Sequence, residues 1–410
     1  MIARFYTFGC KLNQAETREL KEKFKKNDAE ITKADAKADS WVINACVVTQ
    51  KAEREVRQMI HKIRRNFPKS LLVVTGCFTR EMREKERENV DLWADNKEKQ
   101  NLDKILFKKT NKKSKKIFEE LKTETRSLIK IQSGCRHYCR YCVVPFLRQE
   151  IFNRLTKEIV QEIKQKEKQG YKEIVLVGTN IGSYYSEKEK SDLVGCLKEI
   201  LSRTRVPRIR LSSIWPTKIN DRLIYLFKDP RLCPYFHLSV QSASDKVLKR
   251  MKREYTKSDL RKVVKRLRRI PDINLTADFI VGFPGETNSD FQETKAFVKW
   301  AGFLKIHVFR FSPRSGTQAA GFKDQISERT KRIRSKELIK LGENIGRKQR
   351  TGFLGKTFSV LIESKQDSCW RGLTQNYLKV FVKSDKNLAG KIIKVKLLEL
   401  YKDGIKGKIK

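Results

Sequence analysis

Three cysteines, Cys135, Cys139 and Cys142, lie within eight residues directly after the strand-like run 128–132. Soft thiolates of this kind bind zinc or iron-sulfur clusters. A closed structural zinc site needs four protein ligands, and no fourth cysteine or ligand-spaced histidine follows nearby. The C-x3-C-x2-C triplet therefore favours a 4Fe-4S cluster in which one iron has no protein ligand and can bind a substrate or cofactor. A zinc knuckle completed by His137 is the alternative, and a chance group of cysteines is a weaker one.

The N-terminal segment alternates strand and helix signals. It predicts strands at 4–8, 41–45 and 71–75, and helices at 16–26 and 51–67. This order predicts a parallel sheet covered by helices. Each strand runs straight into a cysteine, and these are Cys10, Cys46 and Cys77. Loops that follow parallel strands share one edge of the sheet, so we expect the three thiols to converge as a second three-thiolate site. A single cysteine at such a position would be interpreted as a small buried hydrophobe.

A second series of strands and helices begins at Ser127 and carries the triplet on its first loop. Five more strands are predicted, at 171–177, 208–213, 235–240, 274–281 and 304–311. Six strand-helix units predict a partial barrel, in which the working residues lie on the loops after the strands. Those loops carry Gly178-Thr179-Asn180, Ser212-Ser213, Gln241-Ser242 and the segment 282–286.

The C-terminal segment has the pattern of a small β-domain. After a polar helix at 329–349, apolar and polar residues alternate at 358–362, 373–382 and 391–400, with glycine-containing turns. This predicts a small antiparallel barrel. Residues 350–410 contain 14 Lys and Arg against 5 Asp and Glu. Size, basicity and aromatic content fit an RNA-binding module, and a purely structural barrel is the alternative.

These patterns divide the chain of 410 residues into four parts. We expect an α/β domain at 1–110, a lysine-rich linker at 111–126, the barrel at 127–349 and the β-domain at 350–410. The formal net charge is +44, which favours a polyanionic partner because binding would release its counterions. A general compositional bias toward Lys and Arg is the alternative.

The nine cysteines indicate a reducing compartment rather than a disulfide framework. The chain has no signal-peptide pattern and no apolar run of the eighteen or so residues that a membrane span needs, so we expect a cytoplasmic protein without a membrane partner. In such a compartment, clustered cysteines bind metal or catalyse. Cys196, Cys233 and Cys369 stand apart from the clusters and are interpreted as structural. The histidines, His61, His137, His237 and His307, are likewise not interpreted as ligands.

Several stretches together resemble the methylthiotransferases, a family of radical S-adenosylmethionine (SAM) enzymes with an additional N-terminal cysteine domain and a C-terminal TRAM domain. The resemblance covers almost the whole chain. It is carried by 7–17 around Cys10, 43–49 around Cys46, 74–78 around Cys77, the triplet with 143–148, Gln241-Ser242 with 248–251, 277–287, and 312–317.

The resemblance implies the reaction and the substrate. Around Cys10, the order Gly-Cys-Lys-x-Asn-Gln followed by Glu is similar to the branch that adds a methylthio group to carbon 2 of N6-threonylcarbamoyladenosine at position 37 of tRNA. Alternatives are the same chemistry on isopentenyladenosine in tRNA or on a ribosomal protein aspartate. A non-catalytic iron-sulfur protein that binds RNA is the alternative from another class. The carbon 2 C-H bond is unactivated, so the chemistry must come from a cofactor, and no side chain is nominated as a catalytic acid or base.

The resemblance also implies two 4Fe-4S clusters and SAM as cofactors. Cys135, Cys139 and Cys142 would hold the cluster that binds and reductively cleaves SAM, and Cys10, Cys46 and Cys77 would hold the second cluster. SAM would contact residues on three loops, which are Gly178, Asn180, Gln241, Ser242, Gly282 and Gly285. The implied partners are the tRNA anticodon loop, an electron donor such as a flavodoxin or ferredoxin, and a sulfur source.

Two positions depart from the family pattern. Trp215 stands where the family commonly has Glu, and Gln149 stands where it commonly has Gly after Arg148. The first departure puts in doubt a cofactor or substrate contact by a carboxylate at that position. Neither departure replaces a proposed cluster ligand.

Overall fold

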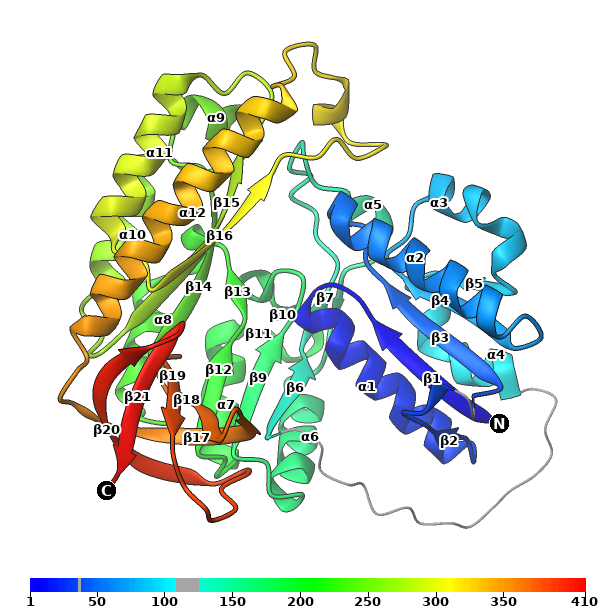
Figure 1. The fold of residues 1–410 in the computed structure, drawn as a ribbon, viewed down its shortest axis with the longest axis horizontal. Coiled ribbons are helices and arrows are strands. Elements are labelled where there is room, and N and C mark those ends of the chain that lie inside the picture. The colour runs from blue at the N-terminus through cyan, green and yellow to red at the C-terminus, as the bar shows by residue number, and fades with distance from the viewer. Residues whose placement is uncertain (36–37, 108–124) are drawn as a thin grey trace. The chain divides into compact units, whose positions relative to one another are not determined.

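The computed structural model describes residues 1–35, 38–107 and 125–410, which form two compact units. The first unit contains the described residues of 1–121 together with 133–152 and 312–320, and the second contains the other described residues. Figure 1 shows the elements of both units. The linker expected at 111–126 lies almost wholly outside the described residues, and the domain boundaries given above remain a prediction.

The first unit is built on a parallel sheet with the strand order β2-β1-β3-β4-β5. On one face, Phe24 of α1 and Leu102 of α4 belong to a core cluster with the sheet, and on the other face Val56 and Ile60 of α2 do so. The predicted parallel sheet with helices is therefore confirmed. The elements are β1 (Ile2–Thr7), α1 (Lys11–Lys26), β2 (Glu30–Ile31), β3 (Ser40–Ala45), α2 (Gln50–Asn66), β4 (Leu71–Gly76), α3 (Arg80–Lys85), β5 (Leu92–Ala94), α4 (Leu102–Phe107) and α5 (Val144–Leu147).

Local sequence explains the central strand and the helix that follows it. All six residues of β3 are buried, as expected for a strand with both faces covered. Helix α2 starts after Thr49, whose side chain accepts a hydrogen bond from the backbone N–H of Ala52 at 3.2 Å and thereby satisfies one of the unpaired donors of the first turn. Val56, Ile60 and Ile63 are the buried residues of α2, and their spacing places them on one face.

The second unit contains the expected six principal strands. β6 (Arg126–Lys130), β9 (Glu173–Val177) and β12 (Arg208–Leu211) pair in parallel, and so do β13 (Ser213–Ile214), β14 (Tyr235–Gln241), β15 (Asn274–Val281) and β16 (Lys305–Arg310). The third predicted strand, 208–213, is divided at Ser212. Its first part, β12, pairs with β9, and its second part, β13, pairs with β14. The chain therefore passes from one sheet to the other within this predicted strand.

Helices and short strands connect the principal strands. They are β7 (Gln132–Ser133), β8 (Phe152–Asn153), α6 (Thr156–Lys168), β10 (Tyr185–Ser186), β11 (Ser191–Asp192), α7 (Leu193–Arg203), α8 (Asp221–Tyr225), α9 (Asp245–Arg250), α10 (Lys257–Leu267), α11 (Asn288–Ala301) and α12 (Glu328–Thr351). Figure 1 shows α10, α11 and α12 along the outer side of β14, β15 and β16. Among the described residues, none of the helices is both long and apolar enough for a bilayer span.

The C-terminal segment forms a closed five-stranded barrel in the order β17-β18-β19-β21-β20. Its strands are β17 (Thr357–Gln366), β18 (Cys369–Thr374), β19 (Lys379–Val382), β20 (Ile392–Tyr401) and β21 (Gly404–Ile409). The small barrel is confirmed, although β19 and β21 pair in parallel. The continuous strand expected at 373–382 is wrong, because a turn separates β18 from β19. There the Thr374 hydroxyl accepts from the Leu378 N–H at 2.8 Å and Tyr377 has φ +71°.

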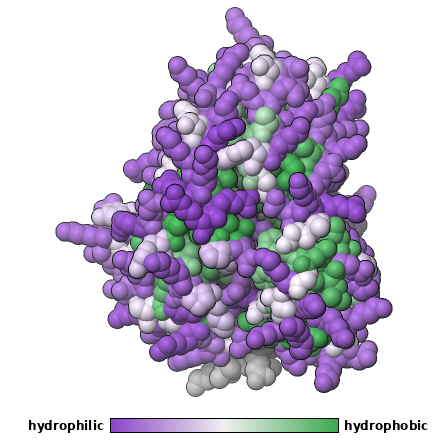
Figure 2. All heavy atoms as spheres, turned by 90° about the vertical axis from the view of Figure 1, so that its left-hand side faces the viewer, coloured by the Kyte–Doolittle hydropathy of each residue, from purple (hydrophilic) through white to green (hydrophobic). Residues whose placement is uncertain are grey.

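A buried ionic network attaches this barrel to β9 and β12 of the three-stranded sheet. Arg210 is fully buried and donates to both carboxylate oxygens of Glu173, at 2.7 and 3.0 Å. It also donates to the carbonyl oxygen of Gln375 at 2.8 Å, and Arg208 donates to that of Leu373 at 2.9 Å. The network thus connects β9 and β12 to the C-terminal barrel. On the face drawn in Figure 2, hydrophilic side chains cover most of the surface.

Candidate metal centre

The N-terminal trio, Cys10, Cys46 and Cys77, lies at one edge of the first unit's sheet. The cysteines follow β1, β3 and β4, which are neighbours. The Cys77 N–H donates to the carbonyl oxygen of Ala45 at 3.0 Å. Burial raises the pKa of the Cys46 thiol to about 12, and the nearby Cys77 and Cys10 thiols add to that rise. The three cysteines therefore lie at the same edge of the sheet, in an environment that disfavours thiolates unless a cation replaces the protons.

Two asparagines hold the backbone around the trio. Asn13 donates to the carbonyl oxygen of Ala45 at 2.8 Å, and its own Oδ1 lies 3.8 Å from the Cys10 thiol. Asn96 donates to the carbonyl oxygen of Gly76 at 3.0 Å, and its Nδ2 lies 3.9 Å from Cys77 Sγ. Amide groups at this distance from sulfur orient thiol ligands and tune the metal that they bind. Sequence reasoning missed both residues, because neither belongs to a ligand pattern.

A buried charged group, Arg148 with Glu16 and Lys99, lies next to the asparagines. The Arg148 guanidinium donates to the two carboxylate oxygens of Glu16 at 2.7 and 2.8 Å, and to Asn13 Oδ1 at 3.0 Å. Lys99 donates to the same carboxylate. Each of the three side chains is at most 5% exposed. Burial opposes the charge of Arg148, but the Cys77 thiol and Glu16 raise its pKa well above the usual value, so Arg148 stays a cation beside the trio.

The triplet lies on a loop of the same unit. Gly134 has φ +85°, and a Cβ there would lie 2.3 Å from the carbonyl oxygen of Glu150, so only glycine permits the two ends of the loop to approach this closely. The Cys142 N–H donates to the carbonyl oxygen of Cys139 at 2.9 Å. Cys139 is buried, while Cys135 and Cys142 are partly exposed. Arg148 follows this loop after the short helix α5, so one segment carries the triplet and a neighbour of the trio.

The two cysteine groups differ from a site for a single metal ion. Among residues 1–35, 38–107 and 125–410, no three histidine, cysteine or carboxylate side chains form a group that could hold one metal ion. Each site offers three thiols, the soft donors that iron-sulfur clusters require.

The residues expected to contact SAM lie at the carboxyl edge of the second unit's strands. The backbone N–H of Asn180, after β9, donates to the side-chain oxygen of Gln132 at 2.9 Å. Gln241 ends β14 with φ +68°. Ser242 is buried and its hydroxyl lies 3.3 Å from that of Thr294, so its side chain supports the loop. Gly178 ends its strand in contact with Gln132.

The loop 282–286 is fixed by a buried carboxylate. Glu286 accepts from the Gly282 N–H at 2.6 Å and from Arg334 at 2.7 Å. Burial raises the pKa of Glu286 to about 6, against these two hydrogen bonds. Gly282 and Gly285 both have positive φ and pack closely, Gly282 against Lys331 and Gly285 against Asp324. The two glycines therefore allow the backbone of this loop to turn and to pack closely against its neighbours.

Polar side chains share one face of β14, β15 and β16, a feature that sequence reasoning missed. The His237 ring lies 2.9 Å from Asp278 through Nε2 and 2.7 Å from the Thr276 hydroxyl through Nδ1. His307, which pairs with Asp278 in register, has its ring 5.5 Å from that of His237. The side chains of His237, Asp278 and His307 are at least partly exposed, whereas Thr276 is buried. Strands of such barrels normally fill the interior with branched apolar residues, so these polar side chains depart from that pattern.

The remaining singled-out residues have structural surroundings. Cys196, Cys233 and Cys369 are buried, as expected, and burial raises the pKa of Cys196 and Cys233 to about 12. Trp215 is buried with the Arg253 guanidinium 3.7 Å above its ring. The Gln149 side chain donates to the carbonyl oxygen of Phe146 at 3.2 Å. The two departures from the family pattern are thus accommodated locally.

Two known families match parts of the chain. The family described as "Radical SAM superfamily" matches residues 129–298. The family described as "Uncharacterized protein family UPF0004" matches residues 3–95. The first match contains the triplet, His237 and Asp278, and the second contains the N-terminal trio.

Curated relatives match nearly the whole chain. The threonylcarbamoyladenosine tRNA methylthiotransferase MtaB of Thermotoga maritima is 35% identical, covering 98% of this chain and 95% of its own. The protein of the same name from Bacillus subtilis is 32% identical, covering 96% and 93%. The tRNA-2-methylthio-N(6)-dimethylallyladenosine synthase of Endomicrobium trichonymphae is also 32% identical, covering 96% of each chain.

Among solved structures, the radical SAM methyltransferase TsrM from Kitasatospora setae aligns with a TM-score of 0.57 and 12% identity, over 78% of this chain and 77% of its own. At this identity the likeness concerns the fold alone. It agrees with the partial barrel of parallel strands described above.

Proposed function

The chain belongs to the methylthiotransferase family of radical SAM enzymes, and from this premise we propose that it adds a methylthio group to carbon 2 of N6-threonylcarbamoyladenosine at position 37 of tRNA. It is a transferase that modifies tRNA. The single observation that carries the proposal is the meeting of Cys10, Cys46 and Cys77 at one sheet edge, in a chain that also holds the C-x3-C-x2-C triplet.

Each cysteine group has its own role in this proposal. Cys135, Cys139 and Cys142 would hold a 4Fe-4S cluster, which when bound would supply the electron for reductive SAM cleavage. Cys10, Cys46 and Cys77 would hold a second 4Fe-4S cluster, the site at which the methylthio group would be assembled and from which it would be delivered to the adenine. Arg148, bonded to Glu16 and Asn13, keeps the backbone of the trio in place and places a positive charge beside its thiolates. A cation there lowers the cost of burying negatively charged sulfur.

The carboxyl edge of the second unit is the proposed SAM site. Gly178 and Asn180 lie on one loop, Gln241 and Ser242 on the next, and Gly282 and Gly285 on a third. The Asn180 side chain donates to the Ser183 hydroxyl of its own loop, and the Ser242 hydroxyl lies 3.3 Å from that of Thr294 on α11. Both residues therefore support the loops on which they lie. The loops thus form a rigid edge that fixes the orientation of SAM without a catalytic acid or base.

The polar face of β14, β15 and β16 supports the choice of substrate. A threonylcarbamoyl group carries a carboxylate, a hydroxyl and a urea linkage with one carbonyl and two N–H groups, whereas an isopentenyl group is wholly apolar. His237, Asp278 and His307 offer hydrogen-bonding partners to the former and would be desolvated at a cost by the latter. The MtaB names of several relatives support the same choice.

The remaining partners follow from the proposed reaction. The tRNA anticodon loop is the substrate region, and the basic C-terminal barrel is proposed to act as a TRAM-like RNA-binding domain. An electron donor such as a flavodoxin or ferredoxin must reduce the cluster, and a sulfur source must renew the transferred sulfur. The proposed location is the cytoplasm, where tRNA is modified.

Mass spectrometry of tRNA nucleosides from a deletion strain tests reaction and substrate together. We expect the methylthiolated threonylcarbamoyl nucleoside to disappear and to return when the wild-type gene is restored. An unchanged level of this nucleoside would eliminate the proposal. Loss of the methylthiolated isopentenyl nucleoside instead, or of a methylthiolated aspartate in ribosomal proteins, would assign the chain to another branch of the family. Anaerobic reconstitution that yields neither cluster nor SAM cleavage would favour a non-catalytic RNA-binding protein.

Replacing Gly9 by alanine should displace Cys46 and reduce iron binding. Gly9 has φ +93°, and an added Cβ would lie 2.6 Å from Cys46 Sγ, far inside contact distance. We expect reconstituted iron to fall by about half, because one of two clusters of equal size is lost. Gly355→Ala is the matched control, since Gly355 also has a positive φ of +82° but no atom within 4 Å of the added Cβ. Equal iron contents in the two variants would contradict the predicted clash.

A further inference from the structure

Helix α2 of the first unit presents a face of basic residues. Arg54, Gln58, His61 and Arg65 lie opposite the buried residues Val56, Ile60 and Ile63 of the same helix, at helical spacing. Arg54 and Arg65 are eleven positions apart, so the face extends about 16 Å along the helix. Together with Arg57 and Lys62, these residues line a shallow groove of about 540 Å³.

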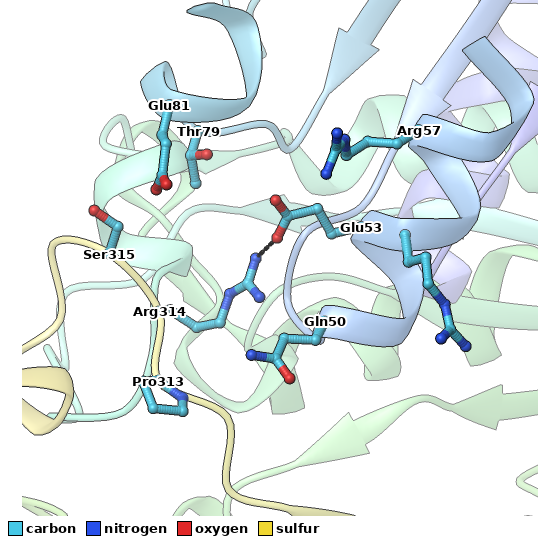
Figure 3. A pocket seen from close by; sticks show the side chains of 9 residues that line it. Gln50, Glu53, Arg57, Thr79, Glu81, Pro313, Arg314 and Ser315 are labelled. Carbon is cyan, nitrogen blue, oxygen red and sulfur yellow. Dashed lines mark hydrogen bonds and ion pairs between the residues drawn. The ribbon is translucent and has the colours of Figure 1, made fainter. Parts of the chain in front are cut away.

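The groove continues into a second cavity of about 370 Å³ at the start of the helix. Arg54 and Arg57 line both cavities, and the second is completed by residues that include Gln50, Thr79, Arg314 and Ser315. Figure 3 shows Arg314, from the segment 312–320, reaching Glu53 at the first turn of α2. The groove therefore leads from the far end of α2 to its first turn, four residues after Cys46.

The carboxylates around α2 are already occupied. Glu53 pairs with Arg314, Glu55 pairs with Lys51 at 3.8 Å, and buried Glu86 accepts from Arg57 at 2.7 Å and lies 2.8 Å from His61. In the described chain, Arg54, Lys62 and Arg65 are left without an ion pair or side-chain hydrogen bond. Three exposed cations that no acid of the protein neutralises favour an external polyanion.

We propose that this α2 groove binds the phosphate backbone of the tRNA substrate, a role that rests on the proposed function. Guanidinium groups match phosphate oxygens in charge and in planar hydrogen-bonding geometry. Gln58 adds a neutral hydrogen-bonding group that suits phosphate and sugar contacts. The groove holds a strand by its backbone, so it contributes affinity and position rather than base recognition. Its direction along α2 leads a bound strand toward the loop that carries Cys46.

Salt-dependent binding of a tRNA transcript tests the groove. The variant R54A/K62A/R65A should lower the affinity at least tenfold near 150 mM salt. It should also reduce the slope of log K against log[salt] by about two, because each lost phosphate contact removes roughly 0.7–0.9 from the slope. All three side chains are exposed and alanine favours helix, so fold and melting temperature should be retained. The variant R54K/R65K keeps the charge and should keep most of the slope.

K157A/K164A/K168A on α6 is the matched control. These three lysines are exposed on one helix at nearly the same spacing, and the charge change is identical. We expect this control to change the slope by less than one. Equal losses of tRNA affinity in the two triple variants would mean that only overall charge matters, and would contradict the proposed groove. Unchanged tRNA binding by the α2 variant would contradict it as well. If the wild-type protein itself does not bind tRNA, the proposed function fails instead. If the α2 variant keeps its tRNA binding but loses binding to anionic vesicles, the groove binds a lipid surface and the proposal is wrong.

Discussion

Alanine at Cys46 should yield a protein that still cleaves SAM but transfers no methylthio group. Cys46 belongs to the N-terminal trio, whereas the triplet loop keeps its three thiols in this variant. We expect about half of the reconstituted iron to remain, and 5'-deoxyadenosine still to form when a reductant is added. Methylthio transfer should fall by more than the roughly 10–100-fold that changes around a metal ligand typically cost.

Replacing Cys139 by alanine should abolish both activities, in contrast to the Cys46 variant. The triplet would lose a ligand, so both SAM cleavage and methylthio transfer should disappear while the iron held by the trio remains. Cys369→Ala is the control for loss of a buried thiol, because Cys369 is 5% exposed and Cys46 is 6% exposed. Chromatography of deoxyadenosine and mass spectrometry of the tRNA give the two activities. Equal loss of both activities in the Cys46 and Cys139 variants would contradict two separate roles.

Replacing Arg148 by methionine should destabilise the first unit by about 3–5 kcal/mol, the usual result of breaking a buried ion pair by removing one partner. Glu16 would lose two hydrogen bonds from Arg148 and Asn13 would lose one. Because the Asn13 Oδ1 also lies near the Cys10 thiol, we expect the trio to bind iron less tightly. Chemical unfolding of the iron-free protein measures the first effect, and chelator competition measures the second.

Two comparisons make this result specific. Arg80→Met removes an arginine that is 92% exposed and pairs with Glu84 on the surface, so its cost should stay below about 1 kcal/mol. In the cycle with Glu16→Gln, the double variant should be more stable than the two single changes predict by at least about 1 kcal/mol, because the residues are in direct contact. Additive effects would mean that Arg148 acts through packing alone and not through Glu16.

Patterns within short stretches of sequence predicted most of the fold. The first three strands, the six-stranded partial barrel and the C-terminal barrel all have alternations or apolar runs that can be read locally. The break at Ser212 could not be predicted, because it depends on two different neighbours, β9 and β14, that lie on either side of the strand. The turn at 375–377 was missed for a similar reason, since it depends on a hydrogen bond from Leu378 to Thr374.

The cysteines could be predicted as site residues because clustered thiols have few other roles in a sequence of this kind. The residues that support them, such as Glu16 and Arg148, have no comparable sequence pattern. Glu16 and Arg148 are 132 positions apart, and each alone resembles an ordinary surface charge. His237 and Asp278 were overlooked because a polar residue at every second strand position is also typical of a solvent-facing strand. Their shared face becomes apparent only when the pairing of β14 with β15 is known.

The C-terminal barrel and the loops proposed to contact SAM lie at opposite ends of the second unit's strands. The barrel is attached through Arg208 and Arg210 near the start of β12, whereas Gly178 and Gly282 follow the last residues of β9 and β15, and Gln241 is the last residue of β14. The seven residues of β14 span about 23 Å. An RNA held by the barrel and by these loops, as the proposed function requires, would have to be longer than a single nucleoside.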